Sequence, residues 1–427
     1  LEHYHIPYSL LVDEVEEALR MHDLGLNVVV GNCDDPETWS KVRIENAAMV
    51  VSTANDFKNT SVAFTARGSA EKIPIITTAS DEASIDILKL AGSDHVFRLE
   101  HMIGQSFARR TLSGDAKSHV IGKFDELLIA EATAHCTPLV GRSLSESNLR
   151  QAVGVTVLGV WERGVFEAAK AETQITENTI LVLAGTKEHL ANYDAFFCIY
   201  NVSNHPVLIL GGGRVGRATA EYLSRRGIDY RIVELLPERI RDPEKYVLGS
   251  AADLAVLEQA GIRQADSVVI TTHDDDVNVY LTIYCRQLRP DIQILSRATH
   301  ERNVATLQRA KADTVLSYAS MGAGRVMNLL EGNKIVMVAE GLDLFEVPVP
   351  SALVGRTIAD SSIREETDCS VVAIRRPSGT EVAPDPHESL PSDAVLILIG
   401  TIKAEQRFLE LYGMRPGNGQ AAASEQA

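Results

Sequence analysis

The second half of the chain alternates short apolar runs with stretches of helical periodicity. Pro206–Leu210 is apolar throughout, as expected for a strand buried on both faces, and a glycine-rich turn and a helix ending near Arg226 follow it. Further strands are predicted at Tyr230–Val233, Tyr246–Leu248, Ser267–Thr271, Gln293–Arg297 and Thr314–Leu316. Helices are predicted between them, at Leu254–Gln259, Asn278–Leu288 and Asn303–Arg309. This alternation predicts an α/β fold with a doubly wound parallel sheet.

After Gly332 the strand candidates become shorter, and Pro and Gly separate them. They lie at Lys334–Ala339, Leu344–Val347, Ser370–Arg375 and Val395–Ile399, with one small helix near Ile358–Arg364. This pattern predicts a compact α+β lobe. The residues from Pro416 onward are of low complexity and are predicted to be disordered.

The chain also contains an internal repeat. Residues 139–150 read LVGRSLSESNLR, and residues 353–364, which lie 214 positions further along, read LVGRTIADSSIR. Segments 177–186 and 392–401 form a second similar pair. A duplication of this length predicts two tandem Rossmann-like doubly wound parallel sheets, each followed by a small α+β C-terminal lobe.

The repeat sets the expected boundaries of the domains. The predicted wound sheets span residues 1–115 and 206–332, the small lobes span 116–190 and 333–414, and a tail spans 415–427. A linker is expected at 191–205. Because it contains Tyr193, Phe196, Phe197 and Tyr200, we expect the linker to pack against the protein.

The two copies differ at the start of the chain. Residues 5–8 align with 227–230, so the first copy lacks a counterpart of 206–222, which holds the first strand, the glycine turn and most of the first helix. That strand lies in the middle of such a sheet, and its loss would leave two unpaired edges in the core. We therefore expect the natural protein to carry this segment upstream of Leu1.

Composition and charge exclude several classes of protein. The formal net charge of −17 argues against a nucleic-acid-binding surface, which would need a basic stripe. The five cysteines form no CxxC pair, which predicts neither a zinc site nor a disulfide framework and fits a reducing compartment. The longest apolar runs fall short of the ~20 residues that a membrane helix needs.

A glycine motif, Gly211-x-Gly213-x-x-Gly216, follows the first strand of the second copy and opens a helix. Gly211 would permit the tight turn, Gly213 would let the backbone approach a pyrophosphate, and Gly216 would let helix and strand pack closely. The backbone N–H groups of Arg214 and Val215, at the helix N-terminus, would then face the phosphates. A glycine turn kept for packing alone is the alternative.

The residue that would select the nucleotide is Glu234, at the end of the second strand. Its carboxylate is placed to accept hydrogen bonds from both ribose hydroxyls and to repel a 2′-phosphate. The motif therefore predicts a site for NAD or an adenosine nucleotide rather than NADP. Thr271 and Thr272, at the carboxyl edge of the sheet, are expected to face the same crevice.

Two further groups of polar residues leave their roles open. Asp274, Asp275 and Asp276 could bind Ca²⁺ or Mg²⁺ if other oxygens converge, but acids that favour a helix N-terminus are the simpler interpretation. In the small lobes, four arginines could meet an anionic ligand at a lobe–lobe interface or form surface ion pairs. They are Arg142, Arg150, Arg356 and Arg364.

No catalytic residue is predicted. Near the glycine motif the sequence has no Ser/His/Asp order, no Tyr-x-x-x-Lys pair and no metal-spaced His/Cys cluster. His273 is a candidate proton donor, but no partner for it is identified. We therefore expect a binding protein rather than an enzyme.

Together these residues resemble the RCK family (regulators of K⁺ conductance), also described as Trk-type potassium-uptake regulatory domains. In the second copy GGGRVG, Glu234, Gly249–Asp253, THDDDVN and Ser296–Ala298 occur in the family's order. The resemblance implies that Asp253 and Arg297 also belong to the nucleotide site, and that Asp13 is the ribose acid of the first copy. The family usually has Gly-Asp where this chain has Gly249-Ser250 and Gly31-Asn32.

The resemblance implies a regulatory machine at the cytoplasmic face of the cell membrane. Four tandem chains would form a homotetrameric ring of eight lobes, controlled by NAD or ADP/ATP, with Ca²⁺ as a further candidate ligand. The membrane pore would be either covalently upstream, as in a tandem-RCK potassium channel, or a separate subunit of a potassium-uptake system. A nicotinamide-dependent oxidoreductase and a nucleotide-binding scaffold without a link to potassium are the rival interpretations.

Overall fold

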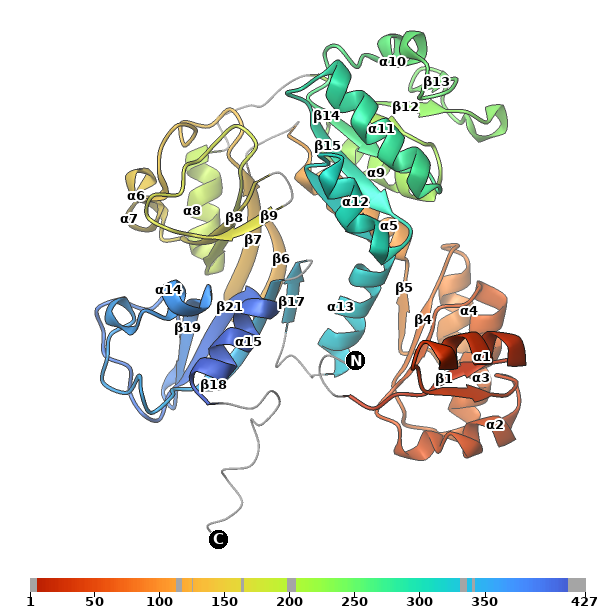
Figure 1. The fold of residues 1–427 in the computed structure, drawn as a ribbon, viewed down its shortest axis with the longest axis horizontal. Helices are drawn as coiled ribbons and strands as arrows, with labels where there is room; N and C mark the ends of the chain where they lie inside the picture. Colours follow the sequence, from red (N-terminus) through yellow and green to blue (C-terminus); the bar gives the residue numbers. More distant parts are fainter. Residues whose placement is uncertain are drawn as a thin grey trace. The chain divides into compact units, whose positions relative to one another are not determined.

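The computed structural model of the chain describes residues 6–112, 117–124, 126–162, 165–197, 205–330, 336–339 and 342–413 (Figure 1). The predicted disordered tail lies outside these residues, and so does Tyr200 of the predicted linker.

The second copy begins with a six-stranded parallel sheet of order β13-β12-β11-β14-β15-β16. Its strands are β11 (Val207–Leu210), β12 (Tyr230–Glu234), β13 (Tyr246–Leu248), β14 (Ser267–Ile270), β15 (Gln293–Ala298) and β16 (Thr314–Ser317). Its helices are α9 (Arg214–Arg225), α10 (Leu254–Ala260), α11 (Asp275–Leu288), α12 (Val304–Arg309) and α13 (Tyr318–Leu330). Every strand predicted in this lobe is present, and β11 lies in the middle, so the doubly wound fold is confirmed.

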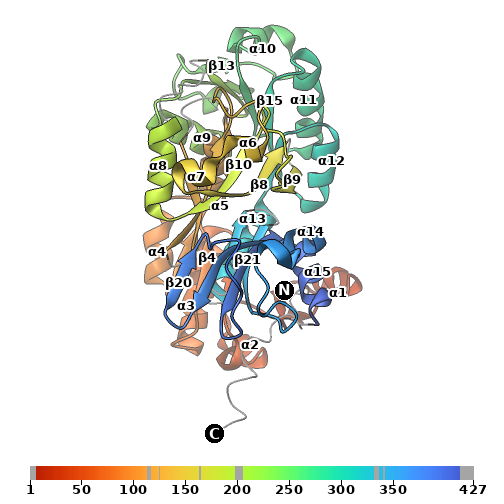
Figure 2. The same cartoon turned by 90° about the vertical axis from the view of Figure 1, so that its left-hand side faces the viewer.

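Successive residues of β11 pack into two different cores. Leu208 and Leu210 face the core that α10 and α11 cover, whereas Val207 and Ile209 face the core beneath α9. Figure 2 shows α9 and α11 on opposite sides of this sheet. A strand buried on both faces needs a continuous apolar run, which is why PVLIL was informative.

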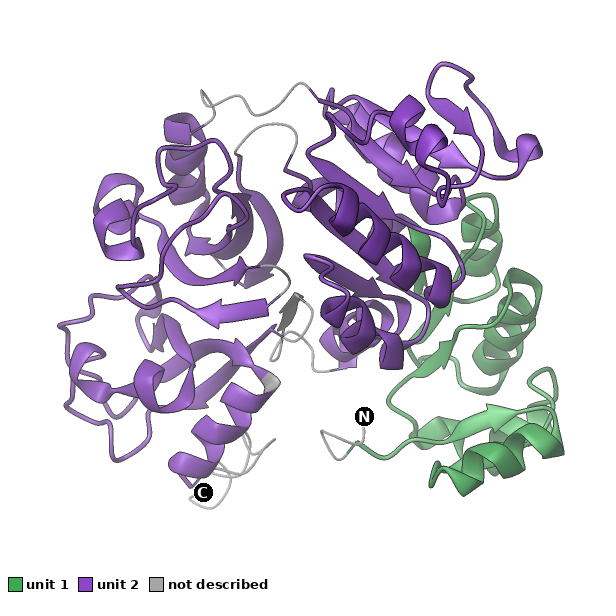
Figure 3. Cartoon of the chain, turned by 45° about the horizontal axis from the view of Figure 1, so that its top comes forward, with its two compact units in different colours: residues 1–100 green, residues 101–427 purple. Residues whose placement is uncertain are grey.

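Helix α5 (Leu99–Arg110) comes from the first copy but packs on the sheet of the second. The chain divides into compact units at 1–100 and 101–427, so the first lobe ends before the expected residue 115 (Figure 3). A Cβ added to Gly104 would lie 2.6 Å from Cβ of Ala218, which shows how closely α5 approaches α9. The amide of Leu112 donates to Ser267 Oγ and Gln293 Oε1, both at 3.0 Å.

The unit at 1–100 repeats the order of the second sheet, except at one place. It contains β1 (Leu10–Val12), β2 (Val28–Val30), β3 (Val50–Ser52), β4 (Ile75–Thr78), β5 (His95–Phe97), α1 (Val15–Asp23), α2 (Pro36–Lys41), α3 (Asp56–Ser69) and α4 (Ser84–Leu90). The strands form two separate parallel sheets, β1-β2 and β3-β4-β5. Among the described residues no strand joins β1 to β3, the place that β11 takes in the second copy, as the alignment of the copies predicted.

The two small lobes share one antiparallel topology, with strand orders β6-β7-β10-β8-β9 and β17-β18-β21-β19-β20. The first contains β6 (His119–Phe124), β7 (Leu127–Thr133), β8 (Thr156–Glu162), β9 (Val165–Ala168), β10 (Ile180–Gly185), α6 (Leu144–Ser147), α7 (Leu149–Val153) and α8 (Lys187–Phe197). The second contains β17 (Val336–Ala339), β18 (Leu342–Pro348), β19 (Ser370–Arg376), β20 (Gly379–Val382), β21 (Val395–Thr401), α14 (Ile363–Thr367) and α15 (Ile402–Leu411).

The residues expected to form a linker begin inside a helix. Helix α8 runs to Phe197, and both Tyr193 and Phe197 are buried in the core of the first small lobe. The aromatic residues therefore pack, as expected, but they do so as part of the lobe. The predicted boundary at residue 190 falls too early, because α8 is the counterpart of α15, whose existence the sequence did not suggest.

The two small lobes pack face to face through their sheets (Figure 1). One apolar cluster contains Ile129, Leu158 and Val182 from the first lobe together with Leu344 and Ile397 from the second. Such a shared core buries apolar surface that each sheet alone would expose, so the pair of lobes is expected to fold as one body.

Two of the four predicted arginines lock this interface reciprocally. Arg150 donates to the carbonyl oxygens of Pro384 (2.6 Å) and Ala383 (3.0 Å) in the second lobe. Arg364, at the equivalent position of the repeat, donates to the carbonyl oxygen of Ala169 (3.0 Å) in the first lobe. These side chains therefore bind backbone of the opposite lobe, and neither the anionic ligand nor the surface ion pair is their role here.

We expect Arg364→Ala to destabilise the paired small lobes by about 1–2 kcal/mol, because it leaves the Ala169 carbonyl without its charged donor. Differential scanning calorimetry would measure this as a lower melting temperature. Arg356→Ala, an exposed arginine of the same lobe, is the matched control and should change little. Equal losses in the two variants would contradict the interface role.

Candidate functional site

The glycine turn has the geometry that its spacing predicted. Gly211 has φ of +110°, a conformation that favours glycine. A Cβ on Gly216 would lie 2.0 Å from the carbonyl oxygen of Gly211 and 2.9 Å from Thr271 Oγ1. Gly213 precedes α9, and a Cβ there would find its nearest neighbour 3.6 Å away, at His273 Nε2. Gly216 therefore serves close packing, and Gly213 borders open space.

Glu234 ties the second strand to this turn. The residue is only 4% exposed, its Oε2 accepts a hydrogen bond from the Gly212 amide at 2.8 Å, and its Oε1 accepts one from the Leu236 amide at 2.9 Å. An ionised carboxylate can accept about four hydrogen bonds, so acceptor capacity remains on both oxygens.

A cavity of about 680 Å³ lies at the carboxyl ends of β11, β12 and β14. Five residues of the predicted site line it: Gly211, Gly213, Glu234, Thr271 and Thr272. The sequence analysis did not single out Leu235, Leu236, Arg239 and Tyr280, which also line it. Leu235 and Leu236 could have been predicted from their position directly after Glu234, because a chain that leaves a strand at this edge of the sheet borders the crevice. The volume is in the range of pockets for small molecules and cofactors.

The other residues predicted for the nucleotide site, Arg214, Val215, Gly216, Asp253 and Arg297, do not line the cavity, whereas His273, Asp274 and Asp276 do. Val215 is 1% exposed and packs in the core, so only backbone N–H groups of Arg214 and Val215 remain candidate contacts. Asp253 caps α10 by accepting a hydrogen bond from the Ala255 amide at 2.9 Å. Arg297 is 2% exposed and donates to Thr299 Oγ1, with its guanidinium 4.8 Å from the ring centre of Tyr318.

The three consecutive aspartates have separate roles. Asp274 caps α11 by accepting hydrogen bonds from the amides of Asp276 and Val277. Asp275 is turned the other way and accepts from the amides of Thr299 (2.7 Å) and His300 (3.0 Å). Within the described chain these carboxylates do not form a converging group of metal ligands, so the interpretation as a helix N-terminus is the one that the structure supports.

The structure gives the environment of Asp275 in more detail. Its carboxylate also accepts a hydrogen bond from Asn303 Nδ2 at 2.7 Å. Burial alone would raise the pKa of Asp275, but the hydrogen bonds from Asn303, Thr299 and His300 outweigh it and hold the pKa below its ordinary value. The Asp275 carboxylate therefore joins the N-terminus of α11 to the loop after β15 through hydrogen bonds.

In the first copy, the predicted ribose acid Asp13 follows β1 and is already paired. Its carboxylate forms an ion pair with Lys58 of α3 and accepts a hydrogen bond from Cys33 Sγ at 3.2 Å. The hydrogen bond from Lys58 is the main cause that holds the pKa of Asp13 below its ordinary value. The repeat places Val277 where the first copy has Lys58, so Glu234 has no equivalent cationic neighbour there.

Comparison with known proteins identifies the family. The TrkA-N domain model matches residues 1–99 and 207–318, and the TrkA-C domain model matches 131–197 and 344–413. The chain belongs to the TrkA-N/TrkA-C family of RCK domains. The crystal structure of the GsuK RCK domain is 34% identical, with a TM-score of 0.67 over 95% of this chain and 90% of that one. The GsuK channel bound to NAD is also 34% identical, with a TM-score of 0.68 over 97% of this chain and 76% of the channel.

Relatives of this tandem RCK protein are named as potassium uptake and potassium channel proteins. A Trk system potassium uptake protein TrkA homolog of Pyrococcus abyssi is 26% identical over 47% of this chain and 94% of its own length. Potassium channel protein 1 of Methanocaldococcus jannaschii is 25% identical over 50% of this chain and 68% of its own length. TrkA of Azorhizobium caulinodans is 23% identical over 84% of both chains. None of the helices in the described part of the chain has the length and apolar character of a membrane span.

Proposed function

We propose that this tandem RCK chain is the ligand-sensing region of a potassium channel and that NAD or an adenine nucleotide binds in its second copy. The cavity lined by the glycine turn and by Glu234 is the observation that carries the proposal. The 34% identity to the GsuK channel bound to NAD, over nearly the whole chain, supports it.

The geometry suggests how such a ligand would lie. A diphosphate would sit against the N-terminus of α9, where the amides after Gly213 and the helix dipole favour anions. The adenosine ribose would donate its hydroxyls to Glu234, and Arg239 would supply positive charge at the cavity wall. Leu235 and Leu236 would border the adenine, since they line the same cavity next to Glu234.

Regulation requires that the ligand bind two states of the assembly with different affinity. We propose that four chains form a ring of eight RCK lobes at the cytoplasmic face of the membrane, below the pore. A coupling of about 1–3 kcal/mol per site, summed over four subunits, would suffice to shift the equilibrium of a pore. This chain would contribute the cavity, which binds the ligand, and the pair of small lobes, which share one apolar core and would transmit a change in the angle between lobes.

The second candidate is a separate regulatory subunit of a Trk-type uptake system. The similarity to TrkA of Azorhizobium caulinodans favours this candidate, because the match covers 84% of each chain. Coexpression with a Trk membrane subunit in potassium-uptake-deficient cells would test it, because a channel fragment should not restore uptake. An oxidoreductase would instead consume NADH in steady-state turnover with a candidate substrate, and we expect none.

Glu234→Gln keeps the shape of the side chain but removes its charge and one acceptor, so we expect it to weaken NAD binding by roughly tenfold to a hundredfold. It should also reduce the preference for NAD over NADP, because the 2′-phosphate would no longer face a carboxylate. Isothermal titration calorimetry with both dinucleotides would measure these changes.

Asp13→Asn, the equivalent change in the first copy, is the matched control for that experiment. We expect it to leave NAD affinity unchanged, because Asp13 is paired with Lys58. If Asp13→Asn abolished binding while Glu234→Gln did not, the site would belong to the first copy. Unaltered NAD affinity in both variants would remove both acids from the site.

A further inference from the structure

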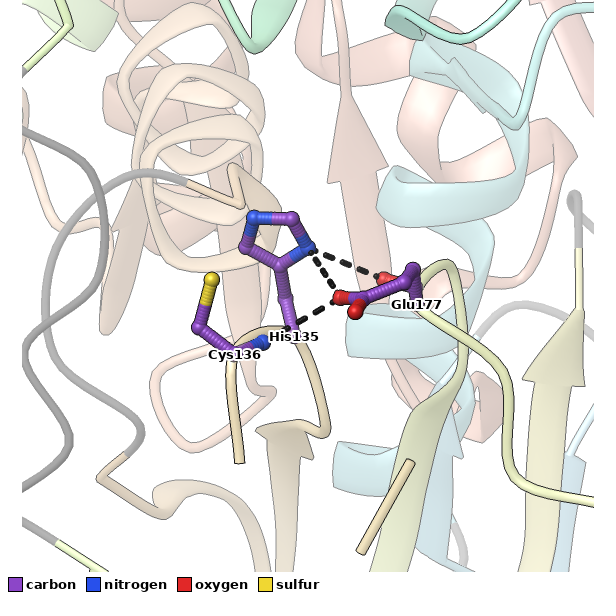
Figure 4. Close-up of side chains that lie close together, drawn as sticks. All are labelled: His135, Cys136 and Glu177. Atoms are coloured by element: carbon purple, nitrogen blue, oxygen red, sulfur yellow. Dashed lines mark hydrogen bonds and ion pairs between the residues drawn. The ribbon is translucent and has the colours of Figure 1, made fainter. Parts of the chain in front are cut away.

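Three side chains of different chemistry meet at one end of the first small lobe (Figure 4). His135 and Cys136 lie in the turn after β7, and Glu177 lies in the turn before β10. His135 Nδ1 is 2.9 Å from Glu177 Oε2, and one ligand atom from each residue lies within 4.8 Å of the other two. Figure 4 shows the imidazole between the thiol and the carboxylate. Among the described residues, these three form the one group of His, Cys, Asp or Glu side chains close enough together to share a metal ion.

The backbone holds these residues together independently of any ion. Cys136 has φ of +55°, and its amide donates a hydrogen bond to Glu177 Oε2 at 3.2 Å. The His135 side chain is 19% exposed and that of Glu177 is 56% exposed, while Cys136 is an exposed residue. The group is therefore preorganised by the turn and open to an ion from solvent.

The second small lobe shows that this group is not needed for the fold. Thr133 pairs with Ile180 as Pro348 pairs with Val395, which aligns the two turns. The second turn, Val349–Ala352, is one residue shorter than 134–138 and contains neither His nor Cys. In this alignment Ser392 takes the place of Glu177. All three ligand types are thus confined to one copy of a duplicated lobe.

We propose that His135, Cys136 and Glu177 bind a Zn²⁺-like divalent metal. One nitrogen, one sulfur and one oxygen ligand match the borderline-soft character of Zn²⁺, whereas Mg²⁺ and Ca²⁺ prefer oxygen alone. Tetrahedral Zn²⁺ with bonds of about 2.0–2.3 Å places its ligand atoms about 3.5 Å apart. The three ligand atoms here lie within 4.8 Å of one another, and His135 Nδ1 and Glu177 Oε2 are 2.9 Å apart, so rotation of the side chains would adjust these spacings to fit the ion. Binding releases the thiol proton of Cys136 to solvent.

The test is a titration of the reduced, chelator-treated full chain with Co²⁺, followed by displacement with Zn²⁺. We expect one Co²⁺ per chain, with a thiolate-to-cobalt absorption band in the near ultraviolet that Zn²⁺ abolishes. Cys136→Ser should remove the band. His135→Val introduces a residue type that the equivalent turn of the second lobe contains, and it should weaken Co²⁺ binding by roughly a hundredfold or more. Neither Ca²⁺ nor Mg²⁺ should compete.

Cys33→Ser is the control, since Cys33 is another accessible thiol beside a carboxylate, and it should leave the band unchanged. Melting temperatures of the metal-free variants should match the parent, because the second lobe folds without these residues. A missing band in the parent, a band that persists in Cys136→Ser, or equal competition by Ca²⁺ would overturn the proposal. NAD titration of the same variants separates this site from the nucleotide site, since NAD affinity without metal should not change.

Discussion

Replacing Gly216 by alanine is expected to abolish NAD binding and to destabilise the second sheet lobe by about 3 kcal/mol or more. The added Cβ would lie 2.0 Å from the carbonyl oxygen of Gly211, a backbone atom that cannot rotate away. Relief requires that α9 move off β11, and this movement would displace the amides after Gly213 that we assign to the diphosphate. Calorimetric melting and isothermal titration with NAD would measure the two effects.

Gly68→Ala is the matched control for that experiment. Gly68 lies in α3 and a Cβ there would meet nothing within 4 Å, so alanine should stabilise the helix by roughly 0.5–1 kcal/mol. Parent-like stability and NAD affinity in Gly216→Ala would show that the turn does not set the distance between helix and strand. Retained binding with lost stability would separate the packing role of Gly216 from the ligand.

Replacing Glu405 by glutamine is expected to stabilise the second small lobe at pH 8 but not at pH 4.5. Glu405 of α15 is 8% exposed, and burial together with the charge of fully buried Asp343 raises its pKa from 4.5 to about 7. The native lobe thus keeps a proton that the unfolded lobe releases. Stability is therefore full below pH 4.5, falls as pH rises to about 7, and is then constant, with a total loss of about 3 kcal/mol.

The melting temperature of parent and variant, measured from pH 4.5 to 8, checks this prediction. Glu410→Gln, on the same helix but exposed, is the control, and any change that it causes in melting temperature should be the same at pH 4.5 and at pH 8. The first copy supports the reasoning, because Leu128 and Leu190 occupy the positions equivalent to Asp343 and Glu405. A gain from Glu405→Gln that does not depend on pH would mean that the carboxyl group is not the cause.

The candidate site was predictable where it depends on local sequence. Gly211, Gly213 and Glu234 follow a buried strand at fixed offsets, and the structure places all three at one cavity. Leu235 and Leu236 were not singled out, because apolar residues after a strand are common and acquire a role only when a cavity forms beside them. Arg239 ends a three-residue 3-10 helix, Pro237–Arg239, which is too short for a periodic pattern to indicate where its side chains point.

Two residues that only the family's order suggested do not line the cavity. Arg297 and Asp253 occur where the family's order suggested contact with the nucleotide, yet one packs beneath Tyr318 and the other caps a helix. In both cases a local partner competes for the side chain, and a partner within a few ångströms outweighs a ligand that is further away.

The amino-acid sequence by itself determined the duplication, the order of strands and helices in the second sheet, and the glycine turn with its acid. These features depend on periodicity and on contacts between neighbours in the chain, which the order of residues specifies directly. It also predicted the gap between β1 and β3, because one copy of a repeat is a template for the other.

Only the tertiary structure decided which residues meet across long separations. In the folded chain Arg150 donates to the carbonyls of residues 383 and 384, and α5 packs on the second sheet. Glu177 likewise lies beside His135 and Cys136. Each of these contacts joins segments whose separation in sequence exceeds any local period. Their partners are chosen by the packing of whole lobes, a sum over many buried side chains that no single motif encodes.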